Sequence, residues 1–161
     1  MIEALPIKAL TEVPEFSTKD SLGNSFSKKS LLGKKYLLFF YPRDNTPGCT
    51  AEACGFRDQQ SFFDKKNILI FGISGDSSNS HEKFRQKFDL PFPLLLDLDN
   101  KIAKAFGVWG KKTFMGRTFE GIHRTTFLVN DEAFVVKTYS KVKAKSHPIE
   151  LVEEINTQKL L

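Results

Sequence analysis

The sequence contains two cysteines, and the surroundings of Cys49 are those of a reactive thiol. Residues 41–50 read YPRDNTPGCT, so Pro42 and Pro47 stiffen the loop that precedes Cys49. We expect a helix to begin here, with Cys49 in its first turn. At that position the unpaired backbone N–H groups and the positive end of the helix dipole favour a thiolate. The segment therefore predicts nucleophilic sulfur chemistry at Cys49.

Other uses of the two cysteines fit the sequence less well. Two are too few for a disulfide framework, and a chain of 161 residues does not need one. A small buried, inert cysteine is the ordinary alternative. A zinc site is not expected, because His81, His123 and His147 have no ligand spacing with the cysteines. We likewise expect no haem, flavin or other cofactor.

The expected secondary structure alternates strands with helices around Cys49. Apolar or alternating runs predict strands at residues 36–40, 68–73, 94–96, 125–129 and 134–140, and an N-terminal hairpin at 16–18 and 25–27. Helical spacing predicts helices at residues 51–63, 80–88, 101–106 and 148–160, the second of them capped by Ser78 or Asn79. This order predicts one α/β domain over residues 1–161, with a mixed central sheet flanked by helices and an N-terminal β-hairpin. A parallel core that ends in an antiparallel hairpin and a helix is typical of the thioredoxin-like fold.

Charge and hydropathy exclude two classes of protein. The 24 basic and 19 acidic side chains give a net charge of +5, a mild excess without a motif that reads nucleic acid. The longest apolar run, residues 36–41, is far shorter than the roughly 20 residues of a membrane span. Glu3 and Pro6 stand where a signal peptide needs a basic start and a long apolar stretch. We therefore expect a cytoplasmic protein that binds neither nucleic acid nor membrane.

Several segments of the chain together resemble one family. Pro42-x-x-x-Thr46-x-x-Cys49 matches the active-site pattern of peroxiredoxins. FFYPRDNTPGCTAEACGFRD, residues 39–58, is similar to the peroxiredoxin Q branch, also called bacterioferritin comigratory protein. The same branch is matched by VPEF at residues 13–16, GISGDS at 72–77, GIHRTTFLV at 121–129 and KVKAKSHPIELVEEI at 141–155. The short pattern alone is a moderate signal, whereas these segments in this order cover nearly the whole chain.

The resemblance implies a role for each residue of the pattern. Cys49 is the peroxidatic cysteine, whose thiolate attacks a peroxide oxygen and becomes a sulfenic acid. The Thr46 hydroxyl hydrogen-bonds the thiolate and the peroxide, and Pro42 shields the pocket from water. Arg124 holds sulfur and oxygen together through its permanently charged, forked guanidinium. Two explanations of Glu52 stay open. It is either an acid that is favourable in the first helical turn, or a group that holds an arginine in place without itself touching the peroxide.

Cys54 follows Cys49 by five residues, on the same expected helix. Five helical residues separate two Cα atoms by about 8–9 Å, beyond the roughly 7 Å that a disulfide allows. Cys54 is therefore either a buried bystander or a partner reached when the start of the helix unwinds, and Gly55, a poor helix former, is consistent with unwinding. The resemblance implies the latter: Cys54 resolves the sulfenic acid as an intramolecular disulfide, the atypical two-cysteine mechanism.

The predicted function is an antioxidant thiol peroxidase that reduces hydrogen peroxide and organic hydroperoxides. Thioredoxin or a similar dithiol is the reductant that the resemblance implies, and the enzyme is expected to be a monomer or a weak homodimer. The alternative is a thioredoxin-like disulfide oxidoreductase without peroxidase activity, although the C-x-x-C pattern of such enzymes is absent. A basic binding module on the same fold is a third interpretation, and it would need neither Thr46 nor Arg124.

Overall fold

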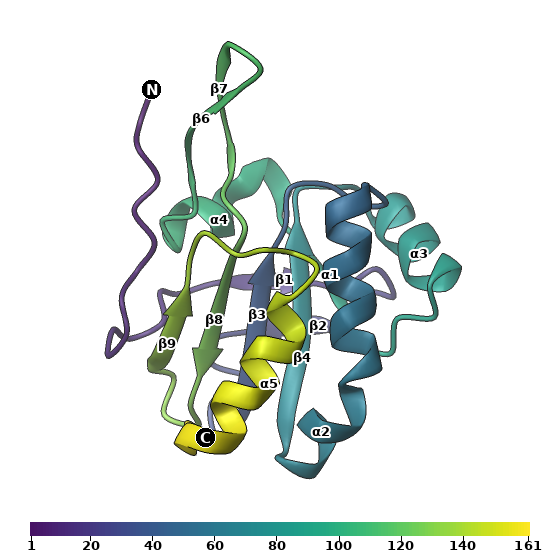
Figure 1. The fold of residues 1–161 in the computed structure, drawn as a ribbon, viewed down its shortest axis with the longest axis vertical. Coiled ribbons are helices and arrows are strands. Elements are labelled where there is room, and N and C mark those ends of the chain that lie inside the picture. The colour runs from purple at the N-terminus through teal and green to yellow at the C-terminus, as the bar shows by residue number, and fades with distance from the viewer.

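The computed structural model describes residues 1–161, and its centre is a five-stranded mixed sheet (Figure 1). The strand order is β5-β4-β3-β8-β9. Its members are β3 (Lys35–Phe40), β4 (Ile68–Ser74), β5 (Leu94–Leu96), β8 (Thr125–Val129) and β9 (Val135–Tyr139). β3, β4 and β5 are parallel, while β8 pairs antiparallel with both β3 and β9. The predicted mixed sheet is therefore confirmed.

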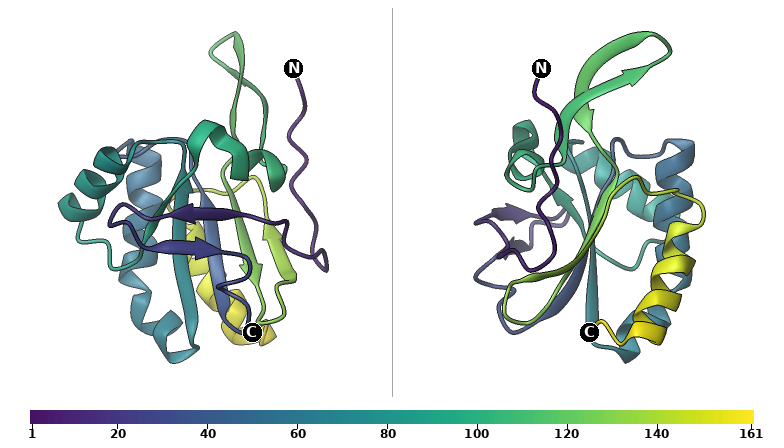
Figure 2. Two further views of the ribbon diagram at one scale, coloured as in Figure 1. Left: turned by 180° about the vertical axis from the view of Figure 1, so that it is seen from behind. Right: turned by 60° about the vertical axis from the view of Figure 1, so that its left-hand side comes forward.

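Helices and a small hairpin cover the two faces of this sheet (Figures 1 and 2). One face carries α1 (Pro47–Asp58), α2 (Gln60–Lys65), α3 (Ser78–Lys87) and α5 (His147–Gln158). The other carries α4 (Lys101–Ala105), the 3₁₀ turn Leu98–Asn100, and the hairpin of β1 (Ser17–Lys19) and β2 (Ser25–Ser27). None of the helices combines the length and the apolar character that crossing a membrane requires.

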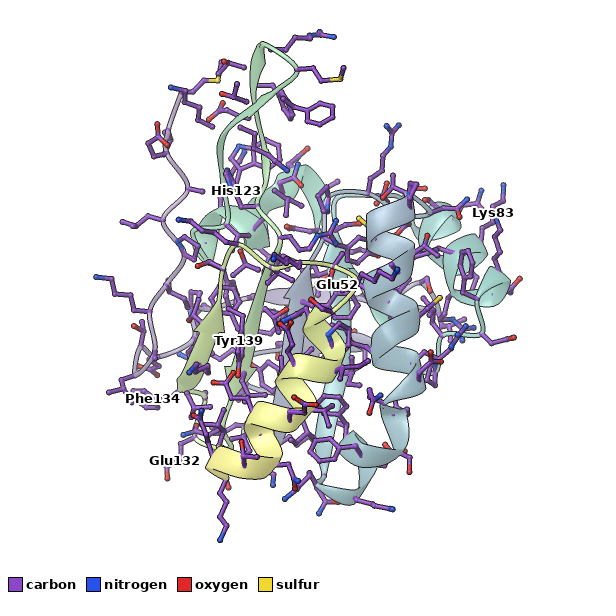
Figure 3. The ribbon with its side chains drawn as sticks, viewed as in Figure 1. Glu52, Lys83, His123, Glu132, Phe134 and Tyr139 are labelled. Atoms are coloured by element: carbon purple, nitrogen blue, oxygen red, sulfur yellow. The ribbon has the colours of Figure 1, made fainter.

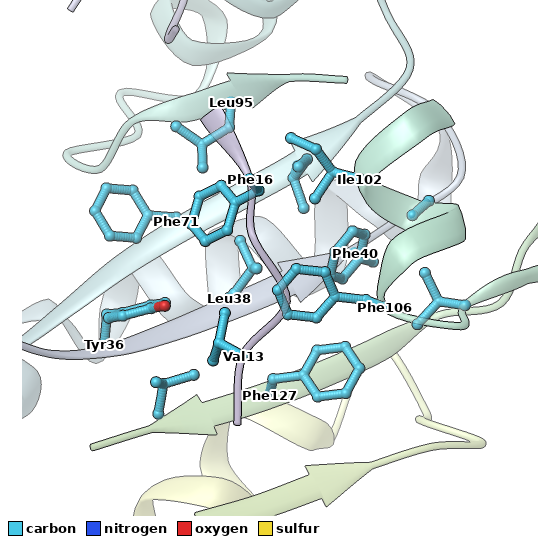
Figure 4. Close-up of a cluster of buried hydrophobic side chains, with 14 of the residues drawn as sticks. Val13, Phe16, Tyr36, Leu38, Phe40, Phe71, Leu95, Ile102, Phe106 and Phe127 are labelled. Atoms are coloured by element: carbon cyan, nitrogen blue, oxygen red, sulfur yellow. The ribbon is translucent and has the colours of Figure 1, made fainter. Parts of the chain in front are cut away.

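The continuous apolar run of β3 is explained by burial on both of its faces. Leu38 and Phe40 point into the core beneath the β1–β2 hairpin and α4 (Figure 4), whereas Leu37 and Phe39 point into the core beneath α1 and α5. Successive strand side chains alternate between faces, so a strand covered on both sides is apolar throughout. The two cores fix the end of β3, where the loop towards Cys49 begins.

The helix expected at residues 51–63 is two helices in the structure. α1 begins at Pro47, because a proline in the first turn has no backbone N–H to leave unpaired, and ends at Asp58. The backbone leaves the helical conformation at Gln59, with φ −103° and ψ 8°, before α2 begins. The earlier start of α1 places Cys49 third in the helix, within the first turn, as the sequence predicts.

The cap of α3 also differs from the expectation. Ser77, rather than Ser78 or Asn79, is the N-cap, and its Oγ accepts a hydrogen bond from the Ser80 N–H at 3.1 Å. Ser77 has the extended backbone that a cap needs, with φ −70° and ψ 162°. The two expected caps lie inside the helix.

A second hairpin, formed by β6 (Trp109–Phe114) and β7 (Arg117–Ile122), was not predicted. Its strands are largely polar and exposed, so they show neither an apolar run nor a buried face. The turn is made by Met115 and Gly116, whose positive φ angles of 51° and 77° suit a tight hairpin. The hairpin projects from the body of the protein (Figure 1).

Candidate active site

Cys49 lies beyond the carboxyl end of β3, where the loop of residues 41–46 leads into α1. Thr46 is the N-cap of α1 and Pro47 its first residue. The cysteine is buried, with 1% of its surface exposed. The first turn of a helix offers unpaired N–H groups and a positive dipole end, which favour a thiolate in a buried site. The carboxyl edge of an α/β sheet is also where ligands ordinarily bind.

A guanidinium reaches the Cys49 sulfur from the neighbouring strand. Arg124 directly precedes β8, whose first residue, Thr125, pairs with Phe40 at the end of β3. This pairing brings Arg124 to Cys49 although 75 residues separate them in sequence. Arg124 Nη2 donates to Cys49 Sγ at 3.3 Å, and Nη1 donates to Glu52 Oε1 at 2.7 Å. One guanidinium therefore bridges the thiol and the carboxylate.

Glu52 is wholly buried one helical turn after Cys49. Figure 3 labels it beside α1. Burial raises the pKa of Glu52 to about 7, and the charge and hydrogen bond of Arg124 oppose this shift. Glu52 Oε2 has no hydrogen-bond partner, so the hydrogen bond to Arg124 is made through Oε1 alone. This is the arrangement that the second explanation of Glu52, a group that holds an arginine in place, requires.

Gly48 leaves the space that this guanidinium occupies. A Cβ atom at position 48 would lie 3.3 Å from Arg124 Nη2 and 3.9 Å from the Ala144 Cβ. The first distance is tighter than ordinary packing, so a side chain here would press the guanidinium away from the Cys49 sulfur. Gly48 therefore leaves room for the Arg124 guanidinium beside Cys49, and no pattern in the sequence predicted this role.

Thr46 and Pro42 lie in the loop that leads to Cys49, and the Thr46 hydroxyl bonds the backbone rather than the sulfur. Thr46 Oγ1 donates to the Arg43 carbonyl at 3.0 Å, not to Cys49. The predicted hydrogen bond from Thr46 to the sulfur is therefore not formed in this structure, and the role of Thr46 towards a bound peroxide stays a prediction. Pro42 is exposed and lines an open pocket of about 330 Å³ beside the loop.

Cys54 lies on α1 with Cys49, and both thiols are free. Cys54 is half-buried, and burial raises the pKa of its thiol while the charge of Arg57 opposes the shift. The adjacent Gly55 has a packing role, because a Cβ atom there would lie 2.7 Å from Pro148 Cγ of α5. This contact is a reason for the glycine besides the weak helix propensity noted from the sequence.

Lys112 is a cation near the site that the sequence analysis missed. It is half-buried on β6, and its Nζ donates to the Ile122 carbonyl at 2.7 Å. Burial lowers the pKa of Lys112 and the charge of Arg124 lowers it further, while Cys49 opposes the shift. Its strand belongs to the unpredicted hairpin, so nothing in the local pattern placed it near Cys49.

One group of side chains has the composition of a metal site. Asp44, Asp76 and His81 each offer a ligand atom, and these atoms lie within 4.8 Å of one another. Both ring nitrogens of His81 are already engaged, Nδ1 with Asp44 Oδ2 at 2.7 Å and Nε2 with the Leu95 carbonyl at 2.8 Å. The group is therefore an internal hydrogen-bond network. Its members come from three separate segments, and no spacing in the sequence links them.

Comparisons with known proteins agree with this geometry. The AhpC/TSA family matches residues 10–138. A putative peroxiredoxin Bcp of Coxiella burnetii is 43% identical over 148 residues, which are 92% of this chain and 98% of the relative. A cysteine-to-serine mutant of Xanthomonas campestris peroxiredoxin Q has a TM-score of 0.86 at 33% identity, over 94% of this chain and 99% of that one.

A further solved structure is that of the Xanthomonas campestris bacterioferritin comigratory protein, described for its alkyl peroxide reduction activity. It has a TM-score of 0.84 at 31% identity and covers 97% of this chain and 99% of its own. The predicted thioredoxin-like fold and the predicted family are both confirmed by these matches. Because the likeness runs over nearly the full length of each relative, the chain belongs to the AhpC/TSA family and, within it, to the Bcp/PrxQ branch of the peroxiredoxins, which are thiol-dependent peroxidases.

Proposed function

We propose that this peroxiredoxin uses Cys49 as its attacking thiolate. The observation that supports this most directly is the Arg124 guanidinium, which lies 3.3 Å from the Cys49 sulfur. The thiolate attacks one peroxide oxygen, and the S–O bond forms as the O–O bond breaks. The second oxygen leaves as hydroxide or alkoxide and takes a proton from water. Arg124 supplies positive charge where negative charge moves from sulfur to oxygen. Cys49 is left as a sulfenic acid.

The neighbouring residues position these groups in our proposal. Glu52 holds one arm of the Arg124 guanidinium at 2.7 Å, which leaves the other arm directed at Cys49. The Thr46 hydroxyl turns from the Arg43 carbonyl to the peroxide when substrate binds, a rotation about one side-chain bond. Pro42, on the surface of the loop, limits the access of water.

Cys54 is the resolving cysteine in this proposal. The Cys54 thiol gives up its proton and its sulfur attacks the sulfenic sulfur; the S–S bond forms as the S–O bond breaks, and the hydroxide that leaves takes a proton to become water. The intact helix holds the two Cα atoms about 8–9 Å apart, which is too far for a disulfide. The first turns of α1 must therefore unwind and carry Cys49 out of its buried position. The half-buried position of Cys54 supports this order of events, because it needs less movement than Cys49.

Organic hydroperoxides join hydrogen peroxide among the proposed substrates. The pocket of about 330 Å³ beside Pro42 is also lined by Trp109, Lys112 and Phe119, so aromatic surface is available to an organic group. A solved relative from Xanthomonas campestris is described for alkyl peroxide reduction, which supports the same substrate class.

We propose thioredoxin, or a similar dithiol in the cytoplasm, as the reductant. The disulfide would form in an unwound segment, where a second protein can reach it, and exchange would return both thiols. In an assay with thioredoxin, thioredoxin reductase and NADPH, we expect NADPH oxidation that depends on added hydrogen peroxide or cumene hydroperoxide. Reduction of insulin disulfides without peroxide consumption would instead support the alternative, a disulfide oxidoreductase.

A further inference from the structure

A buried ion pair lies behind the active-site loop, outside the groups assigned to the reaction. His81 of α3 is wholly buried, and Asp44 of the loop is 8% exposed. Their Nδ1 and Oδ2 atoms are 2.7 Å apart. Asp44 Oδ1 also accepts a hydrogen bond from the Tyr41 hydroxyl at 2.6 Å, and Oδ2 accepts one from the Ser80 hydroxyl at 2.8 Å.

The partners of the ring fix the protonation state of His81. The Leu95 carbonyl, 2.8 Å from Nε2, only accepts, so Nε2 carries a proton. Asp44 accepts hydrogen bonds from the Tyr41 and Ser80 hydroxyls, so its oxygens are the acceptors in this cluster and Nδ1 is the donor in the 2.7 Å contact. Burial alone would lower the pKa of His81, but the hydrogen bond and the charge of Asp44 raise it above the ordinary histidine value. His81 is therefore an imidazolium paired with a carboxylate.

Asp44 is the point at which the active-site loop is attached to the rest of the protein. Between Tyr41 and Cys49 it is the single buried residue, and Pro42, Arg43 and Asn45 are all exposed. Its backbone N–H donates to Asp76 Oδ2 at 2.9 Å. The chain then turns sharply through Asn45, with φ 59°, and α1 begins beyond Thr46. Movement at Asp44 would therefore displace the helix start that carries Cys49.

We propose that His81 is a positioning residue, whose protonated ring holds Asp44 and thereby keeps the loop and the start of α1 in the conformation that reacts with peroxide. The inference rests on the proposed role of Cys49. His81 acts while α1 is folded, when Cys49 reacts with peroxide. It has no role once α1 has unwound and Cys54 reacts.

The pair gives the reaction a predictable dependence on pH. The groups that face the ring are Asp44 from the loop, Asp76 from the β4–α3 connection and Tyr41, which directly follows β3. None of them is a cation, so all of them favour the charged ring or leave it unaffected. Below the raised pKa of His81 both ring nitrogens donate, one to Asp44 and the other to the Leu95 carbonyl. As pH rises through that pKa the ring keeps a single N–H, so one of the two hydrogen bonds and the positive charge that holds the Asp44 carboxylate are lost.

Three variants test this proposal in a Cys54→Ser background, where the reaction of Cys49 with peroxide is isolated from the later steps. His81→Leu removes both hydrogen bonds, and His81→Asn keeps a neutral donor near the place of Nδ1. Lys83→Gln changes an exposed residue of the same helix and is the matched control (Figure 3). The rate of sulfenic acid formation is measured from pH 5 to 10 by quenched flow and mass spectrometry.

We expect the parent rate to fall at alkaline pH, and His81→Leu to lower the neutral rate by about 10- to 100-fold, as small displacements of a reacting group do. His81→Asn should restore most of the neutral rate and lack the alkaline fall, while Lys83→Gln should match the parent. Where His81→Leu does not fold, the parent and His81→Asn profiles decide the question. A parent profile without an alkaline fall, or the same fall in His81→Asn, overturns the proposal. A parent that forms no sulfenic acid refutes the role of Cys49 itself.

Discussion

We expect Cys49→Ser to abolish peroxide reduction, and Cys54→Ser to leave one turnover intact while it blocks cycling with thioredoxin. The Cys49 sulfur accepts a hydrogen bond from Arg124 and lies in the first turn of α1. Cys54 lies further along the helix, and burial raises the pKa of its thiol. A serine hydroxyl at position 49 would stay protonated at neutral pH, so no nucleophile would face the peroxide.

These two variants make the same chemical change on one helix, so each is the control for the other. Consumption of hydrogen peroxide by stoichiometric reduced protein reports the first turnover, and the thioredoxin-coupled assay reports cycling. Dimedone should label Cys49 in the Cys54→Ser protein and label nothing in Cys49→Ser. A normal first turnover in Cys49→Ser would show that the nucleophile lies elsewhere, and normal cycling in Cys54→Ser would show that another thiol resolves Cys49.

The second large effect is expected at Arg124. Arg124→Met should slow the first turnover by about 10²- to 10³-fold, which is typical of removing one group that stabilises developing charge. It should also slow the alkylation of Cys49, because the permanent positive charge and the hydrogen bond beside the sulfur are lost. Arg124→Lys keeps the charge but cannot bridge the sulfur and Glu52 as the guanidinium does. We therefore expect an intermediate rate for the lysine variant.

Two further variants test whether the effect of Arg124→Met comes from the lost guanidinium or from a general disturbance of the site. Glu52→Gln and Thr46→Val should both slow the first turnover by less than Arg124→Met, since each leaves the guanidinium in place. The rate of alkylation of Cys49 by iodoacetamide reports the thiolate, and the rate with peroxide reports the whole reaction. Wild-type values of both rates in Arg124→Met would mean that the guanidinium beside the sulfur has no part in the chemistry.

The elements with strong local patterns could be predicted from the sequence. β3 and β4 are continuous apolar runs because two cores cover them, and a covered strand is apolar on both faces. The hairpin of β6 and β7 could not be found in this way, since its strands are exposed and polar. The break at Gln59 was missed because the apolar positions Phe56 and Phe63 keep a helical spacing across it.

Only part of the site could be predicted from the sequence, because some of its residues lie far apart along the chain. Pro47 and the expected helix start placed Cys49 by local rules, whereas Arg124 reaches it through the pairing of β8 with β3. No spacing rule joins residues so far apart, and the likeness to a known family supplied that link. The pair of Asp44 and His81 had neither a local pattern nor a family motif behind it, so it emerged from the structure alone.

The central claim is that Cys49 reacts in a folded helix and is resolved by Cys54 in an unwound one. Unwinding breaks several backbone hydrogen bonds of α1, each of which contributes about 0.5–1.5 kcal/mol net where water can replace it. Disulfide formation holds the segment open until a reductant acts. The oxidised protein should then be locally looser at α1, while β4 and β8 stay as protected as before.

Hydrogen exchange followed by mass spectrometry, on the reduced protein and on protein treated with one equivalent of hydrogen peroxide, tests this claim most directly. We predict faster amide exchange across residues 47–58 in the oxidised protein, together with a Cys49–Cys54 disulfide in the same sample and unchanged exchange in β4 and β8. Equal protection of residues 47–58 in both states, with that disulfide confirmed by mass, would contradict it.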